Sequence, residues 1–167
     1  DMSATMAEFE NKFSGKSVFV TGADGFIGSH LVDRLLARGE DIVCLDDFND
    51  FYPPQIKRAN VRSHLDSESY TLVEADLRDQ DALKSVFERN PIEKVVHLAA
   101  RAGVRPSLAE PLLYEDVNVR GTLHLLELAR THEVEQLVFA SSSAVYGANT
   151  KTPFSEDDRI ERPISPY

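Results

Sequence analysis

The fold is decided by one stretch near the start of the chain, Val18-Phe19-Val20-Thr21-Gly22-Ala23-Asp24-Gly25-Phe26-Ile27-Gly28-Ser29-His30-Leu31. A β-branched, apolar run leads into glycines at positions 22, 25 and 28, and an amphipathic pattern follows at once. This order predicts a buried strand, a tight turn and a helix start, the layout that places a pyrophosphate on a helix N-terminus. We assign the turn to Gly22, the approach of backbone amides to phosphates to Gly25, and close helix–strand packing to Gly28.

Composition and charge limit the classes of partner. The chain has 167 residues, with 18 Lys and Arg against 28 Asp and Glu, and a net charge of −10. This length suits one α/β domain or part of a larger enzyme. The acidic balance argues against binding to nucleic acid or to an anionic membrane. An anionic ligand must therefore be held by local groups, such as backbone amides and single arginines.

The single cysteine, Cys44, excludes a disulfide or a cysteine-based metal framework, and we expect it to be a small core residue. We predict no metal site. The sequence shows no signal-peptide block and no apolar run long enough to span a bilayer, which favours a cytoplasmic location.

Strands and helices alternate from Ser17 onward, whereas residues 1–16 show no clean period and predict a flexible lead-in. We expect strands at 17–21, 41–46, 70–74, 94–98 and 136–140, and helices at 26–38, 54–65, 79–89 and 111–131. Near-continuous apolar strands are typical of a parallel sheet covered on both faces. The predicted fold class is α/β, a doubly wound parallel sheet (Rossmann) of about five strands in order 3-2-1-4-5. Residues 146–167 are irregular and predict a loop over the carboxyl ends of the strands.

Acidic residues follow the second and third predicted strands. Asp46 closes the second strand, where a carboxylate accepts both ribose hydroxyls of an adenosine, and this favours NAD over NADP because no basic residue follows until Lys57. The alternative is a turn aspartate. Asn49 is expected to share the ribose contact or to form an Asx turn. Asp76 and Leu77 fall where an adenine edge would lie, and helix capping by Asp76 is an equal alternative.

The segment after the fourth strand has small side chains at a switch point of the sheet. Leu98, Ala99 and Ala100 leave room for a flat ligand, or they allow ordinary close packing. We interpret His97 as a hydrogen-bonded core residue rather than a catalyst. Arg101 and Arg105 are placed in the following loop, where they would meet a diphosphate or carboxylate, or form a solvated pair.

Hydroxyl side chains follow the fifth strand in Ser141-Ser142-Ser143-Ala144-Val145-Tyr146-Gly147. Such a run suits a site that binds sugar oxygens or relays a proton, although alone it is only a loop. Together with Tyr167, it becomes more specific.

Four motifs occur in order along the chain: T-G-x-x-G-F-I-G-S-H, H-L-A-A, N-V-x-G-T and S-S-x-x-V-Y-G. On these residues the chain resembles the extended short-chain dehydrogenases/reductases of the sugar-nucleotide epimerase and dehydratase group, from about Ser17 to Tyr167. The resemblance implies bound NAD. It assigns cofactor contacts to Gly22, Gly25, Phe26, Ile27, Gly28, Asp46, Asn49, Asp76, Leu77, Leu98, Ala99, Ala100 and Asn118.

The same resemblance implies a chemistry of C4 oxidation and re-reduction of a UDP-sugar by NAD. Tyr167 matches the catalytic tyrosine, which takes the proton of the sugar 4-hydroxyl, and Ser142 matches the hydroxyl residue that bonds the same oxygen. Tyrosine has a pKa of about 10 in water, so a cation must stabilise its phenolate. The lysine that does so in the family's Y-x-x-x-K motif falls beyond Tyr167. Residues 17–167 are therefore expected to be an incomplete NAD-binding domain, truncated before the sixth strand and without the sugar-nucleotide domain.

Within this group, the stretches 45–52, 100–107 and 145–150 are most similar to UDP-glucuronate 4-epimerases. Arg101, Arg105, Ser142 and Ser143 are the implied substrate contacts. Dehydratases of the group carry an Asp-Glu pair where this chain has Ser143 and Ala144, so simple inversion at C4 is favoured. The alternatives are a UDP-glucose/UDP-galactose 4-epimerase and a non-catalytic NAD-binding half-domain. We expect no turnover by the chain alone, and self-association, as a homodimer, through helix 111–131 or surface uncovered by truncation.

Overall fold

Five short apolar segments form one parallel sheet at the centre of the structure, a computed structural model that describes residues 17–167. The strand order is β3-β2-β1-β4-β5, so the predicted doubly wound fold is confirmed. The predicted lead-in, residues 1–16, lies outside the described residues. The strands are β1 (Ser17–Thr21), β2 (Ile42–Asp46), β3 (Tyr70–Glu74), β4 (Ile92–His97) and β5 (Gln136–Phe139).

Both faces of the sheet are covered, which explains the continuous apolar strands. Val18 and Val20 of β1 point into one core with Cys44 of β2, whereas Phe19 points into a second core on the opposite face. Cys44 is free and fully buried, as predicted from the sequence. Adjacent residues of a strand face opposite ways, so each central strand must supply apolar side chains to both cores.

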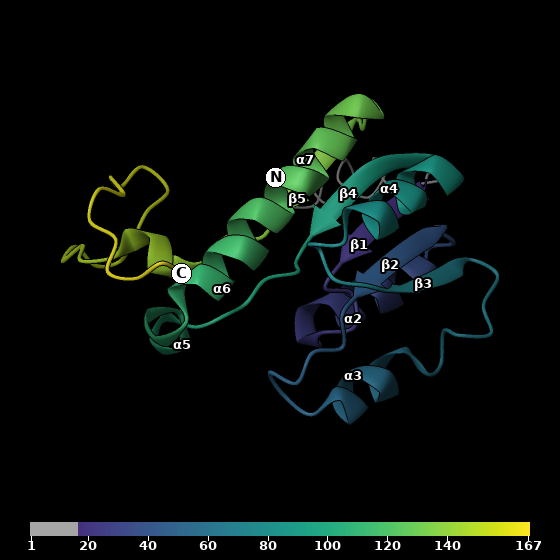
Figure 1. The fold of residues 1–167 in the computed structure, drawn as a ribbon, viewed down its shortest axis with the longest axis horizontal. Coiled ribbons are helices and arrows are strands. Elements are labelled where there is room, and N and C mark those ends of the chain that lie inside the picture. The colour runs from purple at the N-terminus through teal and green to yellow at the C-terminus, as the bar shows by residue number, and fades with distance from the viewer. Residues whose placement is uncertain (1–16) are drawn as a thin grey trace.

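Helices pack on these two faces in pairs (Figure 1). The α2 helix (Phe26–Leu36) and α3 (Pro54–Val61) lie together on one side, and α4 (Gln80–Arg89) and α7 (Gly121–Thr131) on the other. Asp79 caps α4, because its carboxylate accepts a hydrogen bond from the backbone amide of Ala82 at 3.0 Å.

Several predicted boundaries need correction. Helices predicted to reach residues 38 and 65 end at Leu36 and Val61, and the fourth strand begins earlier, at Ile92. The helix predicted at 111–131 is three consecutive parts: α6 (Pro111–Tyr114), the π-helical η1 (Glu115–Arg120) and α7. A π-helical turn has no sequence signature of its own, so the sequence analysis predicted one continuous helix.

A further helix, α5 (Val104–Ala109), was missed by the sequence analysis. It contains Arg105, which was predicted to lie in a loop. Six residues are too few for a clear apolar period, and Pro106 within the segment lowers its helix propensity.

After β5 the chain forms the short 3-10 helix η2 (Ser143–Tyr146) and then runs without helix or strand to Tyr167. Figure 1 shows this last segment, in yellow, at the carboxyl-end side of the sheet, beyond α5 and α6. The segment bonds back to itself, with the amide of Ala148 donating to the carbonyl of Arg162 at 3.0 Å.

Candidate functional site

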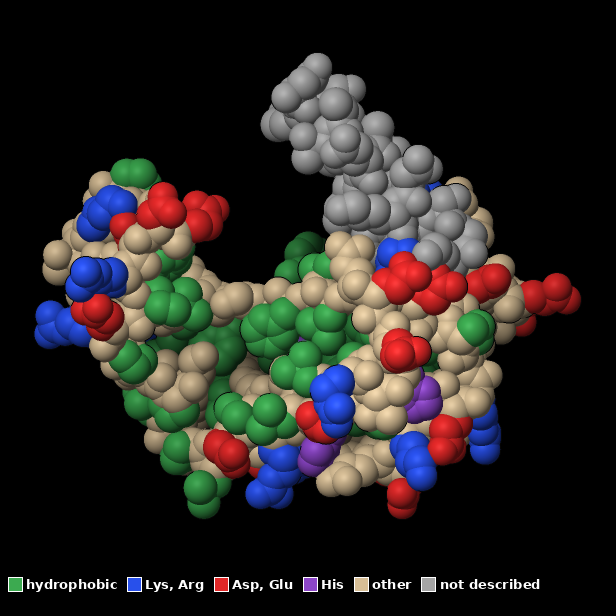
Figure 2. All heavy atoms as spheres, turned by 90° about the horizontal axis from the view of Figure 1, so that it is seen from above, with side chains coloured by type: hydrophobic (Ala, Val, Ile, Leu, Met, Phe, Trp, Pro, Cys, Tyr) green, Lys and Arg blue, Asp and Glu red, His purple; other side chains and the backbone are tan. Residues whose placement is uncertain are grey.

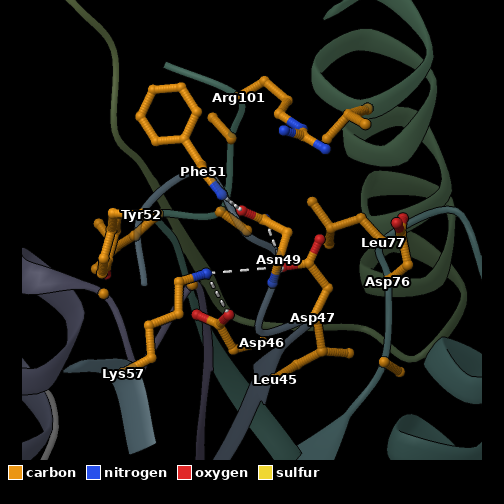
Figure 3. A pocket seen from close by; sticks show the side chains of 17 residues that line it. Leu45, Asp46, Asp47, Asn49, Phe51, Tyr52, Lys57, Asp76, Leu77 and Arg101 are labelled. Carbon is orange, nitrogen blue, oxygen red and sulfur yellow. Dashed lines mark hydrogen bonds and ion pairs between the residues drawn. The ribbon is translucent and has the colours of Figure 1, made fainter. Parts of the chain in front are cut away.

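A pocket opens where β1, β2, β3 and β4 end, at the switch point of the sheet (Figure 3). Its walls come from the glycine turn, the end of β2, the β2–α3 loop, one residue of α3, the segments after β3 and β4, and one residue of η1. The residues that line it are Gly22, Gly25, Leu45, Asp46, Asp47, Asn49, Phe51, Tyr52, Lys57, Ala75, Asp76, Leu77, Leu98, Ala99, Ala100, Arg101 and Val117. Ligands of doubly wound sheets bind at this position.

The glycine turn between β1 and α2 has no room for side chains at two of its glycines. Gly22 has a φ of +67°, and a β-carbon there would lie 2.7 Å from the amide nitrogen of Ala99. A β-carbon on Gly28 would lie 2.2 Å from the carbonyl oxygen of Gly22. Gly25 is the N-cap of α2 and supplies no side-chain cap. The turn therefore holds the helix close to the sheet and leaves its first amides free of a side-chain acceptor.

The end of β2 carries a buried ion pair that was not predicted. Asp46 is 4% exposed, and its Oδ1 accepts hydrogen bonds from the amide of Phe48 and from Lys57 Nζ, both at 2.9 Å. The ammonium of Lys57, a residue 5% exposed, also lies 3.8 Å from Asp47 Oδ1. The sequence offered one signal, because Lys57 lies one helical turn before the apolar Val61. In the structure these two are the buried residues of α3.

The loop after β2 is shaped by Asx turns. The amide and side chain of Asn49 both donate to Asp47 Oδ1, at 3.0 and 2.6 Å, and the amide of Phe51 donates to Asn49 Oδ1 at 3.1 Å. Asn49 therefore forms the Asx turn considered from the sequence, and it also lines the pocket.

Asp76 and Leu77 form the wall after β3. Arg78 donates to both carboxylate oxygens of Asp76, at 3.0 and 2.7 Å, and hydrogen bonds from Arg78 hold the pKa of Asp76 below its usual range. Asp79 caps the next helix, so Asp76 does not have that role. Leu77 is 4% exposed and lies under the backbone of Gly121.

His97 is buried behind the pocket, as the sequence predicted. It is 2% exposed, with Nδ1 2.6 Å from Thr21 Oγ1 and Nε2 2.9 Å from Thr122 Oγ1. Thr122 donates its own proton to the carbonyl of Asn118 at 2.6 Å, so it accepts from Nε2. Burial lowers the pKa of His97 to about 4. A neutral imidazole thus ties β1 to η1 and α7.

Arg101 and Asn118 are joined through the backbone. The amide of Arg101 donates to Asn118 Oδ1 at 2.7 Å, and Asn118 Nδ2 donates to the carbonyl of Arg101 at 2.9 Å. The side chain of Arg101 lines the pocket, whereas Asn118 does not. Asn118 thereby fixes the loop that carries Arg101.

Ser142 and Tyr167, the implied catalytic pair, contact different parts of the chain. Ser142 Oγ caps η2 by accepting from the amide of Ala144 at 3.1 Å. The ring of Tyr167 contacts that of Tyr114, with centroids 6.3 Å apart. Within residues 17–167 no hydrogen bond joins the two, and neither lines the pocket.

The remaining predicted site residues also lie outside the pocket lining. Phe26 and Ile27 begin α2 and are 76% and 67% exposed. Arg105 is on α5, and Ser143 is in η2. Within the described part of the chain, no helix has the length and apolar character to cross a bilayer, and no three His, Cys, Asp or Glu side chains are arranged to hold a metal ion.

Comparison with known proteins identifies relatives for nearly all of this chain. The family model described as GDP-mannose 4,6 dehydratase matches residues 19–167. UDP-glucuronate 4-epimerase 3 of Arabidopsis thaliana is 46% identical over 154 residues, which are 92% of this chain and 36% of that protein.

Solved structures agree with the fold. The UDP-glucose 4-epimerase of Thermus thermophilus, solved in complex with NAD, has a TM-score of 0.78 at 39% identity over 90% of this chain and 46% of that one. The UDP-N-acetylglucosamine 4-epimerase of Methanobrevibacter ruminantium, solved with UDP-N-acetylmuramic acid, has a TM-score of 0.78 at 36% identity, over 91% and 46%.

The chain spans only 36% to 46% of the length of these three relatives. The match nevertheless includes every strand of the sheet except the first two residues of β1, and the whole pocket lining. The chain therefore belongs to the GDP-mannose 4,6 dehydratase family, a group of sugar-nucleotide epimerases and dehydratases.

Proposed function

We propose that this chain is the NAD-binding part of a UDP-sugar 4-epimerase. The observation that carries the proposal is one pocket lined both by Gly22 and Gly25 of the glycine turn and by Asp46, at the carboxyl ends of β1 and β2. The cradle at Gly22 and Gly28 has no space for a side chain, and the N-terminus of α2 has no side-chain cap. These features fit a dinucleotide diphosphate. The Thermus thermophilus relative, whose solved structure holds NAD, supports the same cofactor.

In this proposal the turn from Gly22 to Gly28 holds the diphosphate, with Phe26 and Ile27 contributing backbone amides. Asp46 and Asn49 hold the adenosine ribose, and Asp76 and Leu77 border the adenine. Leu98, Ala99 and Ala100 leave space toward the nicotinamide, and Asn118 keeps that loop in place. When bound, NAD would supply the hydride acceptor and donor for oxidation and re-reduction of the sugar.

The chemical roles of the chain's own side chains follow from the resemblance. Tyr167 would accept the proton of the sugar 4-hydroxyl, and Ser142 would hydrogen-bond the same oxygen. Because these two side chains have separate contacts within residues 17–167, we expect a polypeptide of these residues to bind NAD without epimerising a UDP-sugar.

Titration calorimetry with NAD and NADP tests the cofactor proposal. Asp46 and Asp47 face a single ammonium, Lys57, so the ribose end of the pocket keeps net negative charge and disfavours a 2′-phosphate. We expect NAD to bind at least about tenfold more tightly than NADP. Asp46→Ala should weaken NAD binding by a similar factor. Absence of NAD binding by the unaltered chain at millimolar concentration would refute the proposal.

UDP-glucuronate is the proposed substrate. The 46% identity to an Arabidopsis UDP-glucuronate 4-epimerase supports it, and Ser143 offers a hydroxyl that would donate to the uronate carboxylate. Arg101 and Arg105 are the cations proposed to meet the substrate's anionic groups. UDP-glucose is the alternative, as in the Thermus thermophilus enzyme. The residues after Ser142 carry no acid–base pair, which disfavours a dehydratase.

Ser143→Ala in the active full-length enzyme separates these substrates. A lost hydrogen bond to a charged group costs about 1.5–3 kcal/mol, so we expect KM for UDP-glucuronate to rise by about tenfold or more, while KM for UDP-glucose stays the same. An unchanged KM for UDP-glucuronate would rule out the assigned role of Ser143.

A further inference from the structure

Tyr52 places a hydroxyl group in the pocket that no side chain or backbone group of residues 17–167 pairs with. Its Oη is buried and makes no hydrogen bond to any described residue, although the side chain lines the pocket. The same oxygen lies 3.7 Å from the position of a β-carbon on Gly25, at the start of α2. Buried hydroxyls are nearly always paired in folded proteins, so this one calls for a partner from outside the chain.

The ring of Tyr52 is held by a cation that is itself fixed. Lys57 Nζ lies 5.3 Å from the ring centroid, and the same ammonium donates to the buried carboxylate of Asp46. Figure 3 shows Tyr52 and Lys57 side by side at one end of the pocket. The ion pair therefore orients the ring and leaves the hydroxyl beside the glycine turn.

The chemistry of this hydroxyl suits an anionic acceptor. Burial raises the pKa of Tyr52 above its usual value of 10, so the group stays protonated and can donate. The N-terminus of α2 lies next to it with a positive dipole end and no side-chain cap. A phosphate oxygen at this point would accept from both the hydroxyl and the helix amides.

We propose that Tyr52 Oη donates a hydrogen bond to a phosphate oxygen of the dinucleotide's diphosphate, with Lys57 as the residue that positions the ring. This inference rests on the proposed NAD binding and adds a ligand from the β2–α3 loop, outside the glycine turn. The buried pair of Asp46 and Lys57 would then act at both ends of the pocket. Asp46 would contact the ribose, and Lys57 would position the Tyr52 ring whose hydroxyl contacts the diphosphate.

Calorimetric titration of the chain and of Tyr52→Phe with NAD, ADP and adenosine tests the assignment. Phenylalanine keeps the ring over Lys57 and removes only the oxygen. We expect NAD and ADP to bind about tenfold more weakly to the variant, and adenosine to bind equally to both proteins. Tyr146→Phe is the matched control, because Tyr146 lies outside this pocket, and its affinities should not change.

Thermal unfolding without ligand separates a binding role from a structural one. Since the hydroxyl has no hydrogen-bond partner in the described part of the chain, Tyr52→Phe should unfold at the same temperature as the unaltered chain or higher. A lower unfolding temperature for Tyr52→Phe would mean that the hydroxyl stabilises the protein itself, and it would overturn the inference.

The outcomes distinguish this inference from the function beneath it. If the unaltered chain binds NAD and Tyr52→Phe binds NAD and ADP equally well, the inference is wrong and the proposed function stands. An equal loss for adenosine would assign the hydroxyl to the nucleoside and also overturn it. If the unaltered chain binds neither NAD nor ADP, the proposed function fails and the inference fails with it.

Discussion

At the scale of single residues, Asp24 is the most unusual side chain of the glycine turn. It is 1% exposed; its Oδ1 accepts a hydrogen bond from the Tyr70 hydroxyl at 3.3 Å, and its Oδ2 has no hydrogen-bond partner among residues 17–167. Burial, with a smaller contribution from Asp46, raises its pKa to about 7, against the opposing effects of the Tyr70 hydrogen bond and the cations Lys57 and Arg58. A carboxyl group half neutral at physiological pH thus lies under the predicted diphosphate site.

This burial predicts a specific pH dependence of stability. Between the unfolded pKa of 3.8 and the folded pKa of about 7, the folded chain binds one more proton at Asp24 than the unfolded chain. Its contribution to the free energy of unfolding therefore falls as pH rises through this window, by up to about 1.4 kcal/mol per pH unit, and levels off above it. Asp24→Asn should remove this slope.

Urea unfolding from about pH 5 to about pH 8 measures the effect as the difference between Asp24→Asn and the unaltered chain. The pKa of His97, lowered to about 4 by burial, gives a slope of opposite sign below its unfolded value, and this term cancels in the difference. Asp66→Asn, at an exposed carboxylate, controls for the loss of one negative charge. A difference that does not grow with pH would show that Asp24 is ionised throughout.

At the scale of elements, the junction of β1, the glycine turn and α2 leaves little space for added side-chain atoms. Gly28 lies inside α2, where alanine would normally favour the helix by about 1 kcal/mol. Here a β-carbon would lie 2.2 Å from the carbonyl of Gly22 and 2.7 Å from Ala23. Both contacts are to backbone, which cannot move aside without separating the helix from the sheet, so the steric cost exceeds the gain.

Gly28→Ala should lower the free energy of unfolding by about 3 kcal/mol and abolish NAD binding. Gly39→Ala is the control for backbone strain alone, because Gly39 has a φ of +80° and open space around its α-carbon. That variant should lose about 1 kcal/mol and keep its affinity for NAD. Urea unfolding and calorimetry measure both quantities. Equal stability losses would contradict a steric role for Gly28.

At the scale of the whole molecule, the segments α6, η1 and α7 expose apolar side chains. Leu112, Val119, Leu123 and Leu126 are all exposed, Leu112 to 82% and Leu123 to 55%. Figure 2 shows hydrophobic side chains gathering across the middle of the face seen from above, the side on which Figure 1 places α7. Patches of this kind commonly mark protein–protein contacts, and we propose that this face joins two copies of the chain.

Light scattering over a range of concentrations tests the association. We expect the chain to form dimers. Leu123→Glu should shift it to monomers, because dimerisation would bury the new carboxylate without a partner of opposite charge. Leu65→Glu, at an equally exposed leucine outside this face, should leave the dimer intact. A monomer at the highest concentration would dismiss the proposed interface.

The class of fold, the strand order and the position of the glycine turn could all be predicted from the order of the residues. The strand positions and the glycine turn depend on local signals, which are apolar runs of strand length and glycines between a strand and a helix. The strand order follows from the right-handed crossovers of a doubly wound sheet. The sequence was less reliable at element ends and failed at α5 and η1, where a short segment and a π-helical turn have no period of their own.

The side-chain contacts that shape the pocket could not be predicted from the sequence, because they depend on packing between distant segments. Lys57 donates a hydrogen bond to Asp46, and Asn118 accepts one from the backbone amide of Arg101. The Tyr52 hydroxyl lies beside Gly25. The burial of Asp24 likewise depends on Tyr70, far along the chain. Each of these contacts joins segments that are separate in sequence, and each is set by the packing of helices on the sheet. Local propensity contains no information on such contacts, so they emerge only once the chain has folded.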